Sequence, residues 1–223
     1  MTATPRYSPS VERALTLPRP RWRGAVHKWA FFVSVPVGLA MVAVAPDGRS
    51  ALAGALFAAG MWAMFGVSAL VHLKQWSPGQ FHTLFRLDHS AIFFCIAAHA
   101  SAVLLLALDG RPLQLALGGF WLGAGIGIGA EWLPFHPPRG LMNTMFLVLG
   151  WGAVLLLPWL WDSIGVARFA LLAFGGVLYT VGAVIVGAQR PDPNPEVFGY
   201  HEVWHVFVVL AVICHLLLVL SLY

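Results

Sequence analysis

Charge is scarce in this sequence. Acidic and basic residues make up only 10% of the chain, whereas 59% of its residues are hydrophobic and the mean hydropathy is +0.79. An ordinary soluble domain carries roughly 25% charged residues, so this composition excludes one. Several apolar runs are close to the roughly 20 residues that a helix needs to cross a bilayer. The composition therefore predicts an integral membrane protein.

Lysine and cysteine are also rare. The two lysines, Lys28 and Lys74, both lie outside the last apolar run, which excludes a retinal Schiff base of the rhodopsin kind. The two cysteines, Cys95 and Cys214, each lie within an apolar run. We interpret them as small buried hydrophobic side chains.

The predicted fold is an all-α integral membrane bundle of seven transmembrane helices. Turn-forming residues separate the apolar runs, and no loop is long enough to form another domain. Residues 1–27 are expected to be a flexible, basic cytosolic tail, and residues 28–223 a single transmembrane domain. The seven expected spans are residues 28–45, 51–73, 88–108, 113–133, 141–161, 166–188 and 201–222.

Positive charges predict the orientation, because loops rich in Lys and Arg stay in the cytosol. With the N-terminus inside, ten Lys and Arg residues are cytosolic and three are outside. The sequence therefore predicts a cytosolic N-terminus and an external C-terminus. We expect the basic tail to bind anionic lipid rather than nucleic acid, and the first span to stay uncleaved.

Polar residues gather at the predicted cytosolic ends of three spans. Ser68 and His72 lie four residues apart near the end of the second span, and Asp88 opens the third. His201 and His205 lie four residues apart at the start of the seventh span. This spacing places each pair on one face of its helix. The topology brings His72, Asp88, His201 and His205 to one level of the membrane.

Three imidazoles at one level predict a metal site. Neutral imidazole is the commonest zinc ligand, and a catalytic zinc ion has three protein ligands and one open position. His72, His201 and His205 supply that set, whereas two histidines on one helical face cannot bind opposite sides of a haem. The alternative is that these are interfacial histidines bonded to headgroups or water.

Residues 201–205 also match the His-Glu-x-x-His signature of zinc proteases, in which the Glu is a general base. The third ligand of such a site does not come from His215, about 15 Å further along the same helix. It must come from another helix, as His72 does. Glu202 is therefore kept as a weaker candidate for the base.

Several motifs resemble the hemolysin III family, bacterial relatives of the progestin and adipoQ receptors. The resemblance covers nearly the whole chain from Arg23 onward. It is carried by Ser68-x-x-x-His72, residues 87–94 (LDHSAIFF), Gly150-Trp151, Leu157-Pro158, residues 175–182 (GGVLYTVG) and residues 198–205 (FGYHEVWH).

This resemblance implies a seven-helix fold with one zinc ion held by His72, His201 and His205, and with Ser68 and Asp88 near the metal-bound water. Eukaryotic relatives are linked to lipid amide hydrolysis, and the bacterial branch to membrane lipid homeostasis, which implies a location in the bacterial inner membrane. The chain departs from the family at residues 97–102 (AAHASA), where the family usually has Ala-Gly-Thr-Tyr-Thr-Pro. It also departs at residues 24–27, before the first span.

The leading hypothesis is a zinc-dependent hydrolase of an amide or ester bond in membrane lipids. Asp88 is the expected catalytic residue that orients water or takes its proton, and Ser68 helps to fix that water. The partners expected are membrane lipids, as substrate or ligand. One alternative is a non-enzymatic sensor of membrane state with a structural zinc, and another is a cytolysin, suggested only by the family's name. His99 is expected either to line a cavity or to be a structural, hydrogen-bonded histidine.

Overall fold

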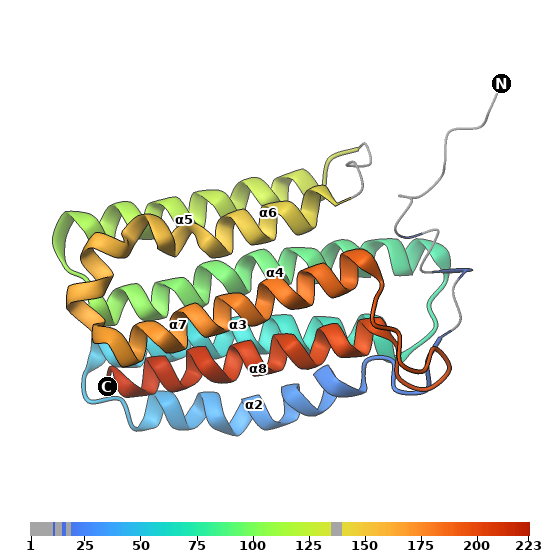
Figure 1. Cartoon of the computed structure of the whole chain (residues 1–223), viewed down its shortest axis with the longest axis horizontal. Helices are drawn as coiled ribbons and strands as arrows, with labels where there is room; N and C mark the ends of the chain where they lie inside the picture. Colours follow the sequence, from blue (N-terminus) through green and yellow to red (C-terminus); the bar gives the residue numbers. More distant parts are fainter. Residues whose placement is uncertain (1–10, 12–14, 17–18, 135–139) are drawn as a thin grey trace.

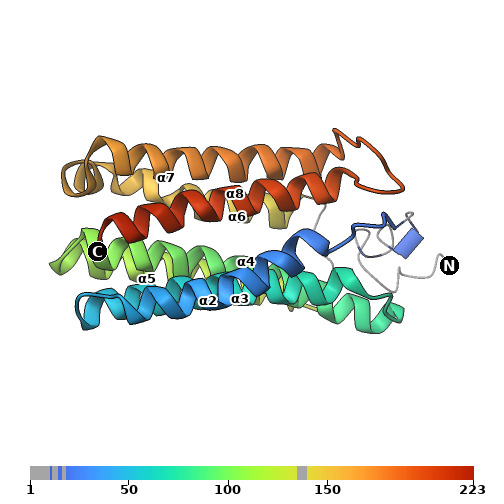
Figure 2. The ribbon, with the colours of Figure 1, turned by 90° about the horizontal axis from the view of Figure 1, so that it is seen from below.

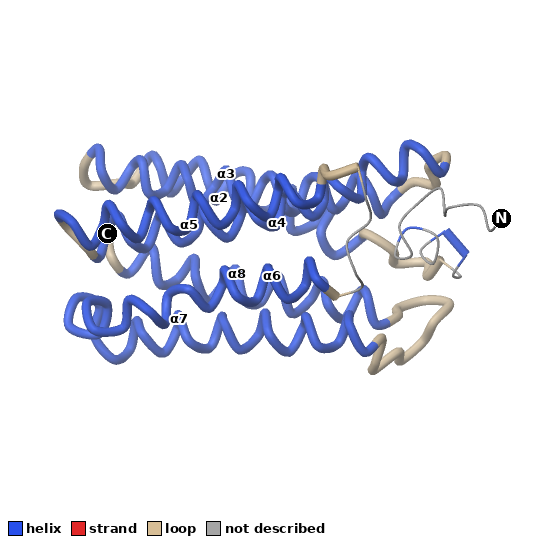
Figure 3. The backbone as a smooth tube through the Cα atoms, turned by 90° about the horizontal axis from the view of Figure 1, so that it is seen from above, coloured by secondary structure: helices blue, strands red, loops and turns tan. Residues whose placement is uncertain are grey.

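The structure is a computed structural model that describes Val11, Leu15, Thr16 and residues 19–134 and 140–223. The described residues form long helices and no strand beyond one isolated bridge between Asn194 and Phe198 (Figures 1 and 3). The long elements are α2 (Ala25–Ala43), α3 (Gly48–Leu73), α4 (Pro78–Ala107), α5 (Gly110–Glu131), α6 (Leu141–Gly150), the 3-10 helix η1 (Trp151–Leu156), α7 (Leu157–Ala188) and α8 (Tyr200–Ser221).

Six helical stretches are long and apolar enough to cross a membrane, judged by length and composition within the described residues. Five of them are α2, α3, α4, α5 and α8, and the sixth is the 48-residue stretch Leu141–Ala188. This finding confirms the prediction of an all-α membrane protein.

The predicted spans 141–161 and 166–188 are not separated by a loop. They lie in one helical stretch made of α6, η1 and α7, in which Gly165 has the non-helical angles φ 74° and ψ 169°. Figure 1 shows that the chain turns back around this part of α7, so that α6 and the rest of α7 run in opposite directions. A positive φ is accessible to glycine because it has no Cβ atom, which lets the helix change direction within a few residues.

Helix α4 begins ten residues before the expected third span. Pro78 occupies its first turn, and Ser77 and Gln80 form a capping box that satisfies free amide groups at the helix start. Asp88 therefore lies about three turns inside the helix rather than at its end. The prediction for the start of this helix was wrong because it followed hydropathy and not the cap.

The helices pack in a bundle with α3 between α2 and α4, and with α7 against α8 (Figure 2). Glycines permit close packing at particular points: a Cβ atom on Gly127 of α5 would come within 2.3 Å of Phe93 of α4. The start of α2 and the end of α8 lie at opposite ends of this bundle (Figure 1).

The chain before α2 contacts the loop between α7 and α8. The amides of Arg21 and Trp22 donate hydrogen bonds to the carbonyls of Glu196 and Val197, at 2.9 and 3.0 Å. These bonds hold residues 19–24 beside the start of α8. Most of the predicted flexible tail, residues 1–27, lies outside the described residues, so the division into a tail and one transmembrane domain stays a prediction.

Candidate metal centre

Three histidines from two helices converge at one end of the bundle. His72 lies in the last turn of α3, and His201 and His205 lie in the first two turns of α8. One ligand nitrogen from each lies within 4.8 Å of the others. His205 is 2% exposed and His72 is 7% exposed, so the group is shielded from solvent.

The spacing of two of these nitrogens matches that of two ligands on a single ion. The Nε2 atoms of His72 and His201 are 3.2 Å apart. Two nitrogens bound at about 2.0–2.1 Å to one tetrahedral ion lie about 3.3 Å from each other. The structure therefore brings together the three histidines expected from the sequence in an arrangement that can hold a metal ion.

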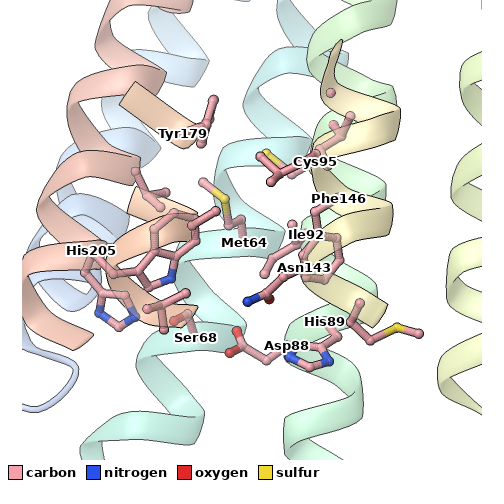
Figure 4. Close-up of a pocket in the computed structure, with 18 of the residues that line it drawn as sticks. Met64, Ser68, Asp88, His89, Ile92, Cys95, Asn143, Phe146, Tyr179 and His205 are labelled. Carbon is pink, nitrogen blue, oxygen red and sulfur yellow. The ribbon is translucent and has the colours of Figure 1, made fainter. Parts of the chain in front are cut away.

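Asp88 and Ser68 lie beside this histidine group. The Asp88 Oδ2 atom is 3.6 Å from His72 Nε2, and the Asp88 side chain is largely buried. Ser68 is one helical turn before His72 on α3 and is 3% exposed. Figure 4 shows Ser68, Asp88 and His205 at one level, around the same space. A carboxylate and a hydroxyl there can accept or donate a proton next to the histidines.

A fourth histidine supports the group. His27, in the first turn of α2, is buried, and its ring stacks on that of His205 with centroids 3.7 Å apart and planes 14° from parallel. Sequence reasoning missed this role. The signal was present, because His27 directly precedes the first predicted span, on the predicted cytosolic side where the other three histidines are expected.

Glu202 is engaged by its neighbours. It is fully buried, its Oε1 atom is 2.9 Å from Arg23 Nε, and its Oε2 atom accepts a hydrogen bond from the Gly199 amide at 2.9 Å. With both oxygens in contact with other groups, Glu202 stabilises the start of α8. This arrangement disfavours it as the general base that the His-Glu-x-x-His spacing suggested.

Two arginines from the segment before α2 hold this end of the site. Besides the Arg23 contact with Glu202, the Arg19 guanidinium donates a hydrogen bond to the main-chain carbonyl of His72. Burial, and then the charge of Arg23, lower the pKa of Arg19 from its ordinary value. Cations at a helix C-terminus stabilise its free carbonyls, so Arg19 helps to fix the end of α3 that carries His72.

A cavity of about 970 Å³ opens from the histidine group into the bundle. Pockets of about 300–1,000 Å³ take ligands of drug size or larger. Its walls come from α3, α4, α6, α7 and α8 and are mainly apolar, including Met64, Ile92 and Phe146 (Figure 4). Leu172 also lines the cavity. The cavity can therefore hold an apolar chain, with one end of that chain at the histidine group.

Glu131 and His99 both line this cavity. Glu131, at the end of α5, is buried and lies with its Oε2 atom 3.1 Å from His89 Nδ1. His99 meets both expectations at once, since it lines the cavity and its Nε2 atom lies 3.1 Å from the Phe57 carbonyl oxygen.

The sequence model of the family described as "Haemolysin-III related" matches residues 15–216. The chain belongs to the haemolysin-III-related family. This match confirms the family resemblance carried by the sequence motifs.

Individual relatives are bacterial and mammalian. This haemolysin-III-related chain is 29% identical over 126 residues to "Hemolysin-3" of Bacillus cereus. The aligned region covers 55% of the chain and 53% of the relative. It is 30% identical over 133 residues to the "Hemolysin-3 homolog" of Bacillus subtilis, with 55% of each covered. It is 28% identical over 166 residues to the human "Monocyte to macrophage differentiation factor", with 72% of the chain and 66% of the relative covered. The matches thus span about half the length of the Bacillus relatives and two thirds of the human one.

Proposed function

We propose that this haemolysin-III-related protein is a zinc-dependent hydrolase that cleaves an amide or ester bond of a membrane lipid. One observation carries the proposal: three imidazole ligand atoms lie within 4.8 Å of one another at the end of a large, mainly apolar cavity.

His72, His201 and His205 would hold the metal ion. Three neutral imidazoles and one open position are typical of catalytic zinc, while hard cations such as Mg²⁺ prefer oxygen ligands. Bound in such a site, zinc lowers the pKa of water toward about 7 and polarises a substrate carbonyl.

Asp88 would accept the proton of the attacking water and later deliver it to the leaving nitrogen or oxygen. Its carboxylate is close enough to His72, at 3.6 Å, to reach a water molecule held between them. Ser68, buried on the same side of the cavity, would orient that water through its hydroxyl. Arg23 and Glu202 would keep the start of α8 in place during the reaction.

A lipid substrate follows from the position and lining of the cavity. The cavity lies among helices that are long and apolar enough to cross a membrane, and its walls suit a hydrocarbon chain. A headgroup linkage would lie at the histidine group with the chain extended into the bundle. We place the protein in the plasma membrane of a bacterium, with lipid homeostasis as its role and membrane lipids as its partners.

We further propose seven crossings, with the N-terminus in the cytosol. The stretch Leu141–Ala188 has 48 residues, and a straight helix of that length would be roughly 72 Å long, against about 30 Å of bilayer core. Two crossings that reverse near Gly165 fit this length. Together with α2, α3, α4, α5 and α8 they give seven, and the histidine group then lies on the cytosolic side.

A second candidate function is a sensor of membrane state with a structural zinc. The Asp88 oxygen lies 3.6 Å from His72 Nε2, which is close to the spacing of two ligands on one ion. If Asp88 were a fourth ligand, the site would be closed, as structural zinc sites are. Zinc would then tie α3, α4 and α8 together without catalysing a reaction.

The test is turnover of ceramides and phospholipids by the detergent-purified protein and its Asp88→Asn variant. The hydrolase proposal predicts turnover by the wild type and a loss of at least about 100-fold in the variant, which still retains zinc. Asp109→Asn is the matched control, since Asp109 is exposed and pairs with Arg49 outside the cavity. Loss of zinc from Asp88→Asn, without any turnover by the wild type, would favour the structural site instead.

A further inference from the structure

A second polar group lines the cavity far from the histidines that would bind metal. His215 lies ten residues after His205 on α8, and His99 lies eleven residues after Asp88 on α4. At about 1.5 Å per residue, both lie about 15 Å deeper along their helices. Tyr179 of α7 lines the cavity too, with its ring centroid 5.8 Å from that of His215. Figure 4 shows Tyr179 on the side of the cavity away from Asp88.

Polar side chains at this depth are costly in a membrane protein and usually have a function. His99 is satisfied within the protein: it is 5% exposed, its ring stacks on Phe57, and it bonds the Phe57 carbonyl oxygen. His99 is therefore part of the cavity wall. His215 and Tyr179 are only partly buried, and both reach the cavity.

The tautomer of His215 follows from its partner. Its Nε2 atom lies 3.3 Å from the carbonyl oxygen of Leu172, and a carbonyl can only accept a hydrogen bond. Nε2 therefore carries the proton, and in the neutral ring Nδ1 is left as an acceptor. Gly175 leaves room for this ring, because a Cβ atom at that position would lie 2.4 Å from Nε2.

The Tyr179 hydroxyl supplies the complementary group. Within the described parts of the chain it has no hydrogen-bond partner, and the one hydrogen bond of His215 is that to Leu172. The deep end of the cavity thus presents one acceptor, His215 Nδ1, and one hydroxyl that can donate. A ligand hydroxyl matches both, since it can donate to Nδ1 and accept from Tyr179. A ketone can only accept, so it would leave Nδ1 without a donor.

We propose that Tyr179 and His215 form a binding site for a hydroxyl group on the hydrocarbon chain of the lipid. This inference rests on the proposed function, which places the lipid's amide or ester linkage at the histidine group. The hydroxyl then lies about 15 Å from the linkage, roughly a dozen bonds along an extended chain whose C–C bonds are about 1.5 Å long. The substrate class is a lipid with a hydroxylated acyl chain.

The test is binding of three fatty acids to the detergent-purified full chain, measured by displacement of a fluorescent fatty acid. The probes are stearic acid, 12-hydroxystearic acid and 2-hydroxystearic acid. Two additional hydrogen bonds at the deep end of the cavity are expected to make 12-hydroxystearate bind about tenfold more tightly than stearate. The hydroxyl of 2-hydroxystearate lies near the carboxylate, so this acid gains nothing from Tyr179.

The Tyr179→Phe variant removes the hydroxyl and keeps the ring, so it reduces the preference for 12-hydroxystearate and leaves stearate binding unchanged. Tyr223→Phe is the matched control, because the Tyr223 hydroxyl bonds the Ser50 carbonyl outside the cavity. Equal binding of stearate and 12-hydroxystearate, a preference unchanged in Tyr179→Phe, or no binding of any acid would overturn the inference. A clear preference without lipid turnover would contradict only the hydrolase proposal.

Discussion

The imidazole of His27 lies flat on that of His205, with ring centroids 3.7 Å apart and planes 14° from parallel. The two rings come from α2 and α8, helices at opposite ends of the chain. A buried stack of this kind restricts the rotation of the His205 ring. The orientation of one candidate ligand therefore depends on a residue that contributes no ligand atom to the group.

We expect His27→Ala to weaken metal binding by about two- to twelve-fold, the equivalent of the 0.5–1.5 kcal/mol that an aromatic pair contributes. His27→Phe retains the stacking surface and keeps most of the affinity. The zinc affinities of both variants and of the wild type are measured by competition with a chelator of known zinc affinity. Equal affinities in the wild type and His27→Ala, or an equal loss in both variants, would show that stacking does not orient His205.

Arg23 and Glu202 form a second supporting contact, with Nε and Oε1 atoms 2.9 Å apart and the carboxylate fully buried. Removing one partner of a buried pair leaves an uncompensated charge, which costs about 3–5 kcal/mol. We expect Arg23→Met to lower the thermal unfolding temperature in detergent markedly. The double variant Arg23→Met/Glu202→Gln should recover part of that loss, because it removes the buried charge. No recovery in the double variant would argue against a stabilising ion pair.

The number of crossings has a direct test in the position of the C-terminus. Seven crossings from a cytosolic N-terminus place Tyr223 outside, whereas six would place both ends in the cytosol. We expect alkaline phosphatase fused after Tyr223 to be active in a bacterial host, and green fluorescent protein fused at the same place to be dark when exported unfolded. The reverse pattern would contradict the proposed reversal near Gly165.

The histidine group could be predicted from the sequence by combining three observations. The apolar runs set the order of the helices, the positive charges set their direction, and His72, His201 and His205 then fall at one level. Side-chain periodicity within α8 places two of these rings on one face. No knowledge of tertiary packing is needed for that step, and the structure brings the three nitrogens together.

Other features depend on contacts that no local pattern reveals. The stacking of His27 on His205 and the pairing of Arg23 with Glu202 join residues about 180 positions apart in the sequence. Hydropathy located the apolar part of α4 but not its start, which the cap at Ser77 determines. It also placed a break at residues 162–165, where the structure keeps helical hydrogen bonding on both sides of Gly165. Close helix packing in α5 depends on such contacts too: Gly123 and Gly127 face a neighbouring helix, while Gly118, Gly119, Gly125 and Gly129 face open space.

The most direct test of this account is the metal content of the detergent-purified protein by elemental mass spectrometry. The wild type is measured beside His72→Ala and the double variant His201→Ala/His205→Ala, with His82→Ala as a matched control outside the histidine group. The account predicts about one zinc ion per chain in the wild type and the control, and none in the other two variants. A wild type without zinc, or variants that keep it, would contradict the metal centre and the hydrolase proposal that depends on it.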